Sequence, residues 1–506
     1  MIRAFTTVFQ GTLLSRMSGM LRDTALAFAF GTSATLAAYF VAFRFAFLLR
    51  RLFGEALVSA VFIPHFSRIK EQDPLKAEKF YGDFFMSVFV MVLSVVFAFE
   101  LAFFYCDYPI ITHMKILLPA LVFLSLYAVN SAFLQCQGVY FLPAIAPLFC
   151  NLTVTFFCLF FQKRQAFSLS GASLMGFGFQ WLSTQLAIMY FWGFSGFCKR
   201  VVSWRPFSKV VRALYAPFIL GTLGISTTQI NSFLDAVFAR YIDIEGPTYL
   251  WFSIRLEQLP LALFGLALST AYFPQLAKRI DQSIDGGLWR FSLEKVLKYG
   301  SLLMVFSTVG LLFFGKEAVS CLYERGSFGE GSVDRTSFCL YAYSLGLFPA
   351  FYTFLATSVF HAQKRYVLPL QGAAFATAIN AVFNVFFTLV FRFSVASVAF
   401  ATALSQWLGA WFLWRKVPAK TDMSYVAKVV FAALSSAFAA SLCQEGLGLP
   451  QVCQSVGITK KWMISAVNLG AGSMFYGIFF MIWMRALHIK ELEQILLRRV
   501  GDEFTN

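Results

Sequence analysis

The chain has 506 residues, of which 59% are hydrophobic and only 13% charged, and its formal net charge is +16. A soluble protein carries about 25% charged residues, so the composition excludes a soluble enzyme and favours a membrane protein. The apolar segments run well beyond the roughly ten alternating residues of a membrane β-strand, which predicts an all-α polytopic membrane protein. Since no soluble domain carries the positive charge, nucleic acid is not an expected partner.

Apolar segments follow one another along the chain, and at about 20 residues per span they predict about fourteen transmembrane helices. The expected spans are 5–30, 34–66, 82–105, 113–137, 141–162, 171–194, 213–241, 247–276, 297–320, 334–361, 367–391, 394–414, 425–443 and 463–486. Arg16, Arg22 and Asp23 interrupt the first span, and no small-residue cleavage site follows it. We therefore interpret it as a membrane span and not as a signal peptide.

Loop charges predict the orientation of these spans. The loops after even-numbered spans are the richer in basic residues, as after the sixth span with Lys199, Arg200, Arg205, Lys209 and Arg212. By the positive-inside rule, these loops are predicted to be cytoplasmic, with both termini inside.

Two pairs of segments repeat within the chain. Residues 38–69 resemble 248–279, and residues 135–143 resemble 361–369. Each pair keeps its place relative to an even-numbered span, so the pattern predicts two six-helix lobes in a parallel pseudo-repeat around a central cavity, as in transporters.

The predicted parts of the chain are therefore an N-terminal lobe, an amphipathic cytoplasmic linker, a C-terminal lobe, and a C-terminal helix pair with a cytoplasmic tail. Their boundaries are 1–196, 197–212, 213–416 and 417–506.

Charged side chains interrupt the first two spans. They are Arg16, Arg22 and Asp23 in the first span and Arg44, Arg50, Arg51 and Glu55 in the second. A charge at mid-bilayer is costly and usually faces a cavity or a partner. At about 100° per residue, Arg44, Arg51 and Glu55 share one face and Arg50 points elsewhere. The arginines outnumber the carboxylates, and guanidinium groups match phosphate geometry, so the pattern favours an anionic substrate. The alternative is ion pairing within the protein, which we expect for Arg51 with Glu55.

A second polar set lies in later spans: Asp235, Asn380, Asn384 and Thr402. Their oxygens could hold Na⁺, or Asp235 could carry a proton; the alternative is hydrogen bonding between helices. No GxxxxGK[ST] or HExxH motif indicates an ATPase or a metalloprotease, so we expect a transporter without a cofactor. The nine cysteines form no CxxC pair, and Cys443 and Cys453 could pair across one loop.

Several segments of the sequence together resemble a known family. "SRMSGMLRD" (15–23) followed by "AYFVAFRFAFLLRRLFGEALVSAVFIPHF" (38–66) is similar to the MurJ (MviN) family of lipid II flippases, in the multidrug/oligosaccharidyl-lipid/polysaccharide (MOP) exporter superfamily. "FLPAIAPLFCN" (141–151), "IRLEQLPLALFGLALSTAYFPQLAK" (254–278) and "ERGSFGEGS" (324–332) match as well, in order along the chain.

The resemblance implies fourteen helices and movement of lipid II, the undecaprenyl-pyrophosphate-linked peptidoglycan precursor, from the inner to the outer leaflet of the bacterial inner membrane. Its cavity arginines fall on Arg16, Arg22, Arg50 and Arg255, and its acidic residue of the second span falls on Glu55. From the charge pattern we expect Asp23 and Arg44 to support this site. The resemblance also implies a groove for the polyprenyl tail in the last two helices. We expect a monomer, with cell-wall synthesis proteins as further partners and with Na⁺, H⁺ or the membrane potential as the driving force.

The sequence departs from the family at acidic positions. The family often has an aspartate where this chain has Ala37, and an acidic residue where it has Ile254. These changes weaken a salt-bridge gating scheme and leave the anion-binding role intact. The alternatives are an exporter of another lipid-linked oligosaccharide, a cation-coupled multidrug exporter, a membrane transferase or a scaffold. An arginine-rich cavity argues against cationic drugs, and no clustered carboxylates support a transferase.

Overall fold

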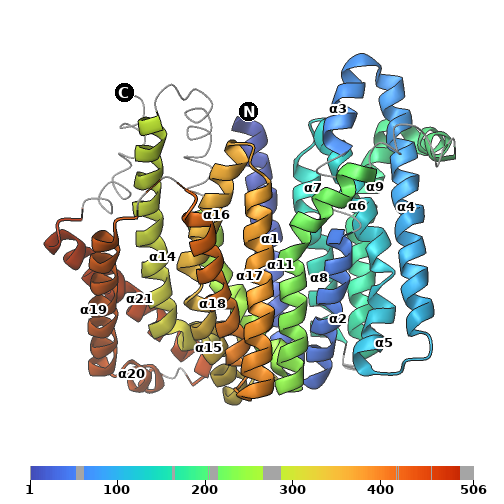
Figure 1. Ribbon diagram of the computed structural model, residues 1–506. Helices are drawn as coiled ribbons and strands as arrows, with labels where there is room; N and C mark the ends of the chain where they lie inside the picture. Colours follow the sequence, from blue (N-terminus) through green and yellow to red (C-terminus); the bar gives the residue numbers. More distant parts are fainter. Residues whose placement is uncertain are drawn as a thin grey trace. The chain divides into compact units, whose positions relative to one another are not determined.

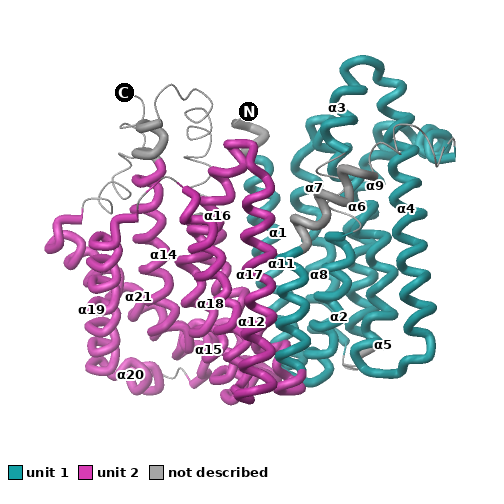
Figure 2. Tube along the Cα trace, in the orientation of Figure 1, with its two compact units in different colours: residues 1–240 teal, residues 241–506 magenta. Residues whose placement is uncertain are grey.

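The computed structural model of the protein describes residues 2–52, 62–161, 166–202, 204, 215–265, 286–417, 419, 421–456 and 459–489. Within these ranges the secondary structure is helical and contains no strand, which confirms the all-α expectation. The chain forms two compact units, residues 1–240 and 241–506, coloured separately in Figure 2. This division is coarser than the four predicted parts, which remain a prediction.

The first unit contains the helices coloured blue to green in Figure 1. They are α1 (Ile2–Phe30), α2 (Ala34–Arg50), α3 (Ile63–Gln72), α4 (Pro74–Phe103), α5 (Pro109–Leu117), α6 (Ala120–Cys136), α7 (Phe141–Ile145), α8 (Pro147–Phe160), α9 (Ala166–Val202) and α11 (Tyr215–Ile242), whose last two residues fall in the second unit.

Capping residues set where two of these helices begin. The Ser33 hydroxyl accepts a hydrogen bond of 3.4 Å from the backbone N–H of Leu36 at the start of α2. Asp73 caps α4, because its carboxylate accepts from the N–H groups of Leu75 and Lys76 at 3.0 and 3.2 Å. These hydrogen bonds, first that from the Lys76 N–H, lower the pKa of the Asp73 carboxyl below its ordinary value.

Prolines divide two predicted spans into pairs of helices. Span 113–137 consists of α5 and α6, which meet next to Pro119, and span 141–162 consists of α7 and α8, which meet at Pro147. A proline lacks the backbone N–H that would continue the helical ladder, so the helix is interrupted there. Gly193 breaks α9 for a different reason, because its φ of 70° is not helical and is a conformation that favours glycine.

The core of the first unit lies among α4, α6 and α9. Aromatic side chains dominate it, and Tyr81 packs against Phe133 with ring centroids 4.8 Å apart. A hydrogen-bond chain links three of its polar side chains: the Tyr81 hydroxyl donates to Asn130 Oδ1 at 2.7 Å, and Asn130 Nδ2 donates to Gln185 Oε1 at 3.0 Å. Such hydrogen bonds hold membrane helices together where no water competes.

The second unit contains the elements coloured green-yellow to red. They are α12 (Gly246–Pro260), the π-helical turn η3 (Leu261–Gly265), α14 (Gly286–Tyr323), α15 (Glu330–Ser344), α16 (Leu347–Ala362), α17 (Val367–Val385), the π-helical turn η4 (Phe386–Val390), α18 (Ala396–Trp414), α19 (Met423–Leu447), α20 (Leu449–Ser455) and α21 (Lys461–Ala486).

Two hydrophobic clusters organise the second unit on opposite flanks of α14. One packs α14 against α16 and α18, and the other packs it against the C-terminal pair α19 and α21. In the second cluster, the rings of Phe306 and Tyr476 stack with centroids 4.3 Å apart, and the Tyr476 hydroxyl donates to the Phe306 carbonyl at 2.9 Å. The C-terminal helix pair is therefore packed directly onto α14.

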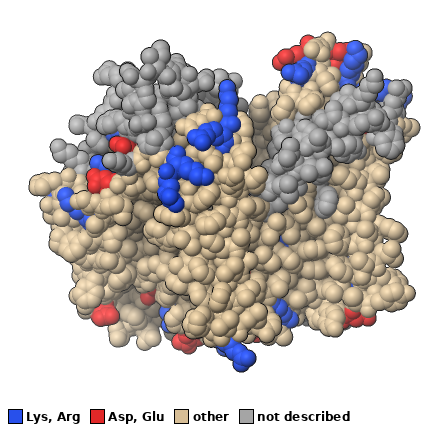
Figure 3. All heavy atoms as spheres, viewed as in Figure 1, with Lys and Arg blue, Asp and Glu red and all other residues tan. Residues whose placement is uncertain are grey.

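The described residues include eight helical segments that are long and apolar enough to cross a membrane, or nine if α15 and α16, bent by 44°, form one span. This confirms a multi-pass membrane protein, whereas the predicted number of about fourteen is not confirmed by this criterion. The charged helices α1 and α2 are not among the eight. In Figure 3 most of the visible charged side chains lie along the upper and lower parts of the face, and few are visible across its middle.

The predicted linker 197–212 is only partly described. Residues up to 202 continue α9 as a helix, and residue 204 is also described, whereas 203 and 205–212 lie outside the described residues. The described part is anchored to α4, because Arg200 forms an ion pair with Glu78 and stacks over the Trp192 ring at 4.6 Å. The predicted cytoplasmic tail beyond residue 489 lies outside the described residues.

Candidate functional site

Arg22 is the centre of a hydrogen-bonded cluster on α1. Its Nε and Nη2 donate to Asp23 Oδ1 at 3.0 and 2.7 Å, and its Nη1 donates to Asn151 Oδ1 on α8 at 3.1 Å. The side chains of Arg22 and Asp23 are only 13% and 4% exposed. Asp23 supplies a countercharge and Asn151 fixes the direction of the guanidinium, so the cluster holds the positively charged Arg22 side chain within an apolar helix bundle.

Asn151 is itself held in place from two sides. Its Nδ2 donates to Ser18 Oγ at 2.9 Å and to the Ser15 carbonyl at 3.2 Å, both on α1. A guanidinium carries five N–H groups, and the contacts of Arg22 to Asp23 and Asn151 use three of them. Two N–H groups of Arg22 therefore remain for a ligand, as far as the described residues show.

Asn151 was not among the residues predicted from sequence. The available signal was an asparagine inside the apolar segment "PLFCNLTVTFF" of α8. Such a residue usually hydrogen bonds to a neighbouring helix, but the sequence does not identify which one.

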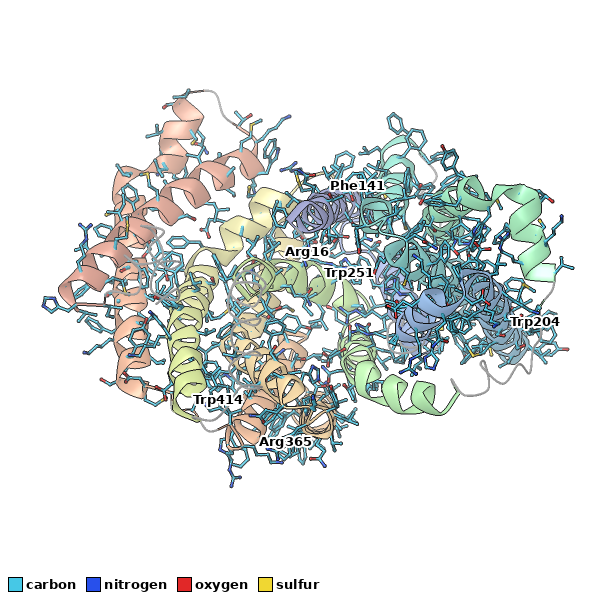
Figure 4. The ribbon with its side chains drawn as sticks, turned by 90° about the horizontal axis from the view of Figure 1, so that it is seen from above. Arg16, Phe141, Trp204, Trp251, Arg365 and Trp414 are labelled. Atoms are coloured by element: carbon cyan, nitrogen blue, oxygen red, sulfur yellow. The ribbon has the colours of Figure 1, made fainter. Side chains whose placement is uncertain are left out.

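Arg16 lies nearly two turns before Arg22 on α1, and its side chain is exposed. The helix runs close to α7 there, since a Cβ on Gly11 would lie 2.8 Å from Cβ of Ala144. Figure 4 labels Arg16 and Phe141, which come from these two neighbouring helices. The accessible Arg16 and the buried Arg22 therefore form an outer and an inner position along one helix.

The arginines of α2 have different environments. Arg44 is only 5% exposed, and its Nη1 donates to the Ser232 carbonyl of α11 at 2.8 Å. Arg50 is half-buried and its guanidinium stacks over the Phe47 ring at 4.7 Å. Arg51 is half-buried, with its Nε lacking a hydrogen-bond partner among the described residues. Glu55 lies outside the described residues, so its pairing with Arg51 stays a prediction.

Arg255 of α12 repeats the arrangement of Arg50. It is half-buried, and its guanidinium stacks over the Trp251 ring, one turn earlier in the same helix, at 4.3 Å. Stacking occupies the face of the guanidinium and leaves its N–H edge directed away from the ring. Each of these two arginines is thus oriented by an aromatic side chain about one turn away in its own helix.

The structure brings some of the predicted site residues together. Arg16, Arg22 and Asp23 share α1, with Arg22 and Asp23 in direct contact, and Arg44 and Arg50 share α2. Arg255 belongs to the second unit, where Trp251 is its stacking partner. Phe47 and Trp251 were missed from sequence, because aromatic residues are common throughout this chain and their spacing alone does not set them apart.

The second polar set is a hydrogen-bonded network between helices. Asn380 Nδ2 of α17 donates to Thr402 Oγ1 of α18 at 3.0 Å, and Asn384 Nδ2 donates to Asn380 Oδ1 at 2.7 Å. This geometry agrees with the interhelical alternative.

Asp235 lies in the first unit, is buried, and accepts a hydrogen bond of 3.4 Å from Asn231 Nδ2. Among the described residues, no group of three or more His, Cys, Asp or Glu side chains is arranged to hold a metal ion. The sodium or proton site therefore stays a prediction. Cys443 and Cys453 are both free thiols, so their suggested pairing is wrong for this structure.

Comparison with known proteins gives consistent matches. The family described as "Lipid II flippase MurJ" matches residues 26–467. A protein of Chlamydia trachomatis described as a probable lipid II flippase MurJ is 33% identical over 432 residues, covering 82% of this chain and 78% of that protein.

Solved structures share the fold. A lipid II flippase MurJ in an inward closed conformation matches with a TM-score of 0.77 at 23% identity, covering 95% of this chain and 99% of the other. An inward-facing multidrug resistance transporter of the MATE family, in the MOP superfamily, matches with a TM-score of 0.63 at 12% identity, covering 82% and 95%. At these identities the two structures show the fold alone, and the family rests on the sequence matches.

Proposed function

The chain belongs to the family of the lipid II flippase MurJ, and on this premise we propose that it moves lipid II from the inner to the outer leaflet of a bacterial inner membrane by alternating access. The observation that carries the proposal is the Arg22 cluster, in which Asp23 and Asn151 hold a buried guanidinium with N–H groups to spare. As a transporter it carries its substrate across and performs no catalytic reaction.

The arginines supply what a pyrophosphate needs in order to leave water. Charge-assisted and bidentate hydrogen bonds from guanidinium groups replace its hydration. Arg16, exposed on α1, meets the headgroup first, and Arg22 receives it further along the helix. Arg50 and Arg255 each stack on an aromatic ring, which orients the guanidinium without neutralising its charge. Binding an anion here lowers the cost of carrying its charge through a medium of low dielectric constant.

The lipid tail stays in the bilayer or in a groove at the C-terminal helix pair, while rearrangement of the lobes exposes the headgroup outside. Both termini lie in the cytoplasm, and the protein acts as a monomer. Cell-wall synthesis proteins that use lipid II are its natural neighbours. A multidrug exporter of cationic compounds is disfavoured, because basic side chains repel a cationic substrate.

The return step uses the membrane potential or a cation, and Asp235 is the proposed acceptor of that cation. Replacing Na⁺ by K⁺ at constant ionic strength tests this part. If Na⁺ drives the return, transport falls in K⁺, and Asp235→Asn removes the dependence on the ion. Equal rates in both salts at every membrane potential contradict sodium coupling.

The proposed function is tested by replacing the flippase of a bacterial host with this chain and measuring lipid II in the outer leaflet with a headgroup-specific probe. We expect exposure at the host's own level and its loss in Arg22→Ala. Arg365→Ala is the matched control, because Arg365 is exposed beyond the end of α16. Absence of outer-leaflet lipid II with normal amounts of membrane-inserted protein would overturn the assignment.

A further inference from the structure

A separate cavity lies entirely within the second unit, between α14, α16 and the start of α19. Its volume is about 500 Å³, within the range of sites that bind small molecules. The residues that line it include Glu294, Lys298 and Ser301 on α14, Tyr352 on α16, and Asp422 before α19. None of these residues belongs to the arginine site, and nothing in the proposed transport cycle uses them.

The position of the cavity relative to the membrane follows from the helices that form it. Residues Leu293–Tyr323 and Met423–Ser455 are each long and apolar enough to cross a membrane. At about 1.5 Å per residue both segments exceed the roughly 30 Å of a hydrocarbon layer, so Glu294 and Asp422, next to their first residues, lie toward the boundary with the lipid headgroups. Ser301, two turns further along α14, is only 1% exposed, so the cavity extends from this boundary inward.

The charges that line the cavity are not balanced by one another. Lys298 Nζ lies 3.7 Å from Asp422 Oδ2 and 5.4 Å from the Tyr425 ring centroid, so its charge is shared with Asp422. Asp422 has a second role, since its Oδ1 caps α19 by accepting from the Tyr425 N–H at 3.0 Å. Glu294 is half-buried and makes no hydrogen bond or ion pair with the other described residues. The described lining therefore carries one carboxylate more than its cations neutralise.

The remaining lining groups, which lie further along α14 and on α16, suit a phosphate ester. The hydroxyls of Ser301 and Tyr352 are hydrogen bonded to each other at 2.9 Å, and the Tyr352 hydroxyl also forms a hydrogen bond with the Thr421 side chain. Hydroxyl groups and the Lys298 ammonium are donors that a phosphodiester accepts. Tyrosine rings beside a carboxylate form a favourable environment for an ammonium group.

We propose that this cavity binds the headgroup of an ethanolamine phospholipid, with the ammonium on Glu294 and the phosphate on Lys298 and the neighbouring hydroxyls. A primary ammonium brings three N–H donors to Glu294, whereas the quaternary ammonium of choline brings none. A glycerol headgroup leaves a net negative lipid beside the unbalanced carboxylate. The polyprenyl pyrophosphate of the proposed substrate is disfavoured for the same reason.

The test is native mass spectrometry of the full chain in detergent, with ethanolamine, choline and glycerol phospholipids of identical acyl chains. We expect roughly tenfold tighter binding of the ethanolamine lipid than of the other two, as loss of one charge-assisted hydrogen bond implies. This comparison uses the unaltered protein, so it does not depend on the folding of a variant or on transport of lipid II.

Variants then locate the site. Glu294→Gln should reduce binding of the ethanolamine lipid to the level of the choline lipid. Asp422→Asn should leave the start of α19 capped, because asparagine is an equally good N-cap. Glu445→Gln is the matched control, since Glu445 is an exposed carboxylate at the other end of α19. Equal affinity for the three lipids, a preference for the glycerol lipid, or an unchanged preference in Glu294→Gln would each overturn the proposal.

Discussion

Arg22 on α1 donates a hydrogen bond of 3.1 Å to the side-chain oxygen of Asn151 on α8, across 129 positions of the chain. Asn151 is in turn fixed by Ser18 and by the Ser15 carbonyl. The direction of the guanidinium therefore depends on a second helix and not on α1 alone. This dependence makes Asn151 a positioning residue for the proposed substrate site.

Asn151→Ala should reduce transport by about tenfold, because a hydrogen bond to a charged group contributes about 1.5–3 kcal/mol. Arg22 keeps its ion pair with Asp23, so the amount of folded protein in the membrane should stay near the unaltered level. The measurement is outer-leaflet lipid II per folded molecule.

Thr153→Ala is the control on the same helix, since the exposed Thr153 hydroxyl bonds only to the Phe149 carbonyl of its own helix among the described residues. A loss of lipid II transport in both variants, or in neither, is inconsistent with a positioning role for Asn151.

Arg50→Lys and Arg255→Lys should each impair transport although they keep the positive charge. Lysine cannot form bidentate hydrogen bonds and stacks less well on Phe47 or Trp251. Weakened affinity for a water-soluble pyrophosphate analogue, measured by calorimetry, should accompany the loss. If lysine restores full transport, charge alone suffices and the orientation by the aromatic rings has no role.

Arg44→Ala should lower stability more than it lowers substrate affinity. Arg44 is buried and bonds to the Ser232 carbonyl, 188 positions away, so its removal leaves that carbonyl without this donor. The expected cost is about 2 kcal/mol, measured as reduced thermal stability in detergent. An unchanged melting temperature together with lost affinity for the pyrophosphate analogue would place Arg44 among the substrate ligands instead.

The start of α4 should loosen at low pH. Hydrogen bonds from backbone N–H groups lower the pKa of Asp73, so its stabilising contribution is present above the ordinary carboxyl pKa and is lost as the pH falls through the lowered value. Hydrogen exchange at Leu75 and Lys76 should then accelerate relative to Asp73→Asn, which caps at every pH. Comparing the two proteins at each pH removes the intrinsic pH dependence of amide exchange. A ratio of their exchange rates that stays constant with pH contradicts the prediction.

Much of the architecture could be predicted from sequence, because it rests on local properties. Apolar length predicts the spans, and the cost of a charge within the membrane draws attention to the arginines of the first two spans. The resemblance to the family, not the helical spacing, selected Arg16, Arg22, Arg50 and Arg255 among the arginines. What could not be predicted depends on contacts between distant segments, such as Arg22 with Asn151 and Arg44 with Ser232.

The breaks within predicted spans have a different origin. Span 113–137 has apolar residues on both sides of Pro119, so hydropathy treats it as one segment although the backbone is interrupted. The extent of the second span and the role of Glu55 stay predictions, because 53–61 lie outside the described residues.

If this chain itself carries lipid II across a bilayer with Arg22 as a ligand, transfer should be visible in a purified system. The purified protein is placed in vesicles with lipid II in one leaflet, and access of a headgroup-modifying enzyme added to the other side is followed. Access should increase with the unaltered protein and with Arg365→Ala, and fall to the protein-free level with Arg22→Ala. Transfer that is equally fast with Arg22→Ala, at equal protein content, would contradict this expectation.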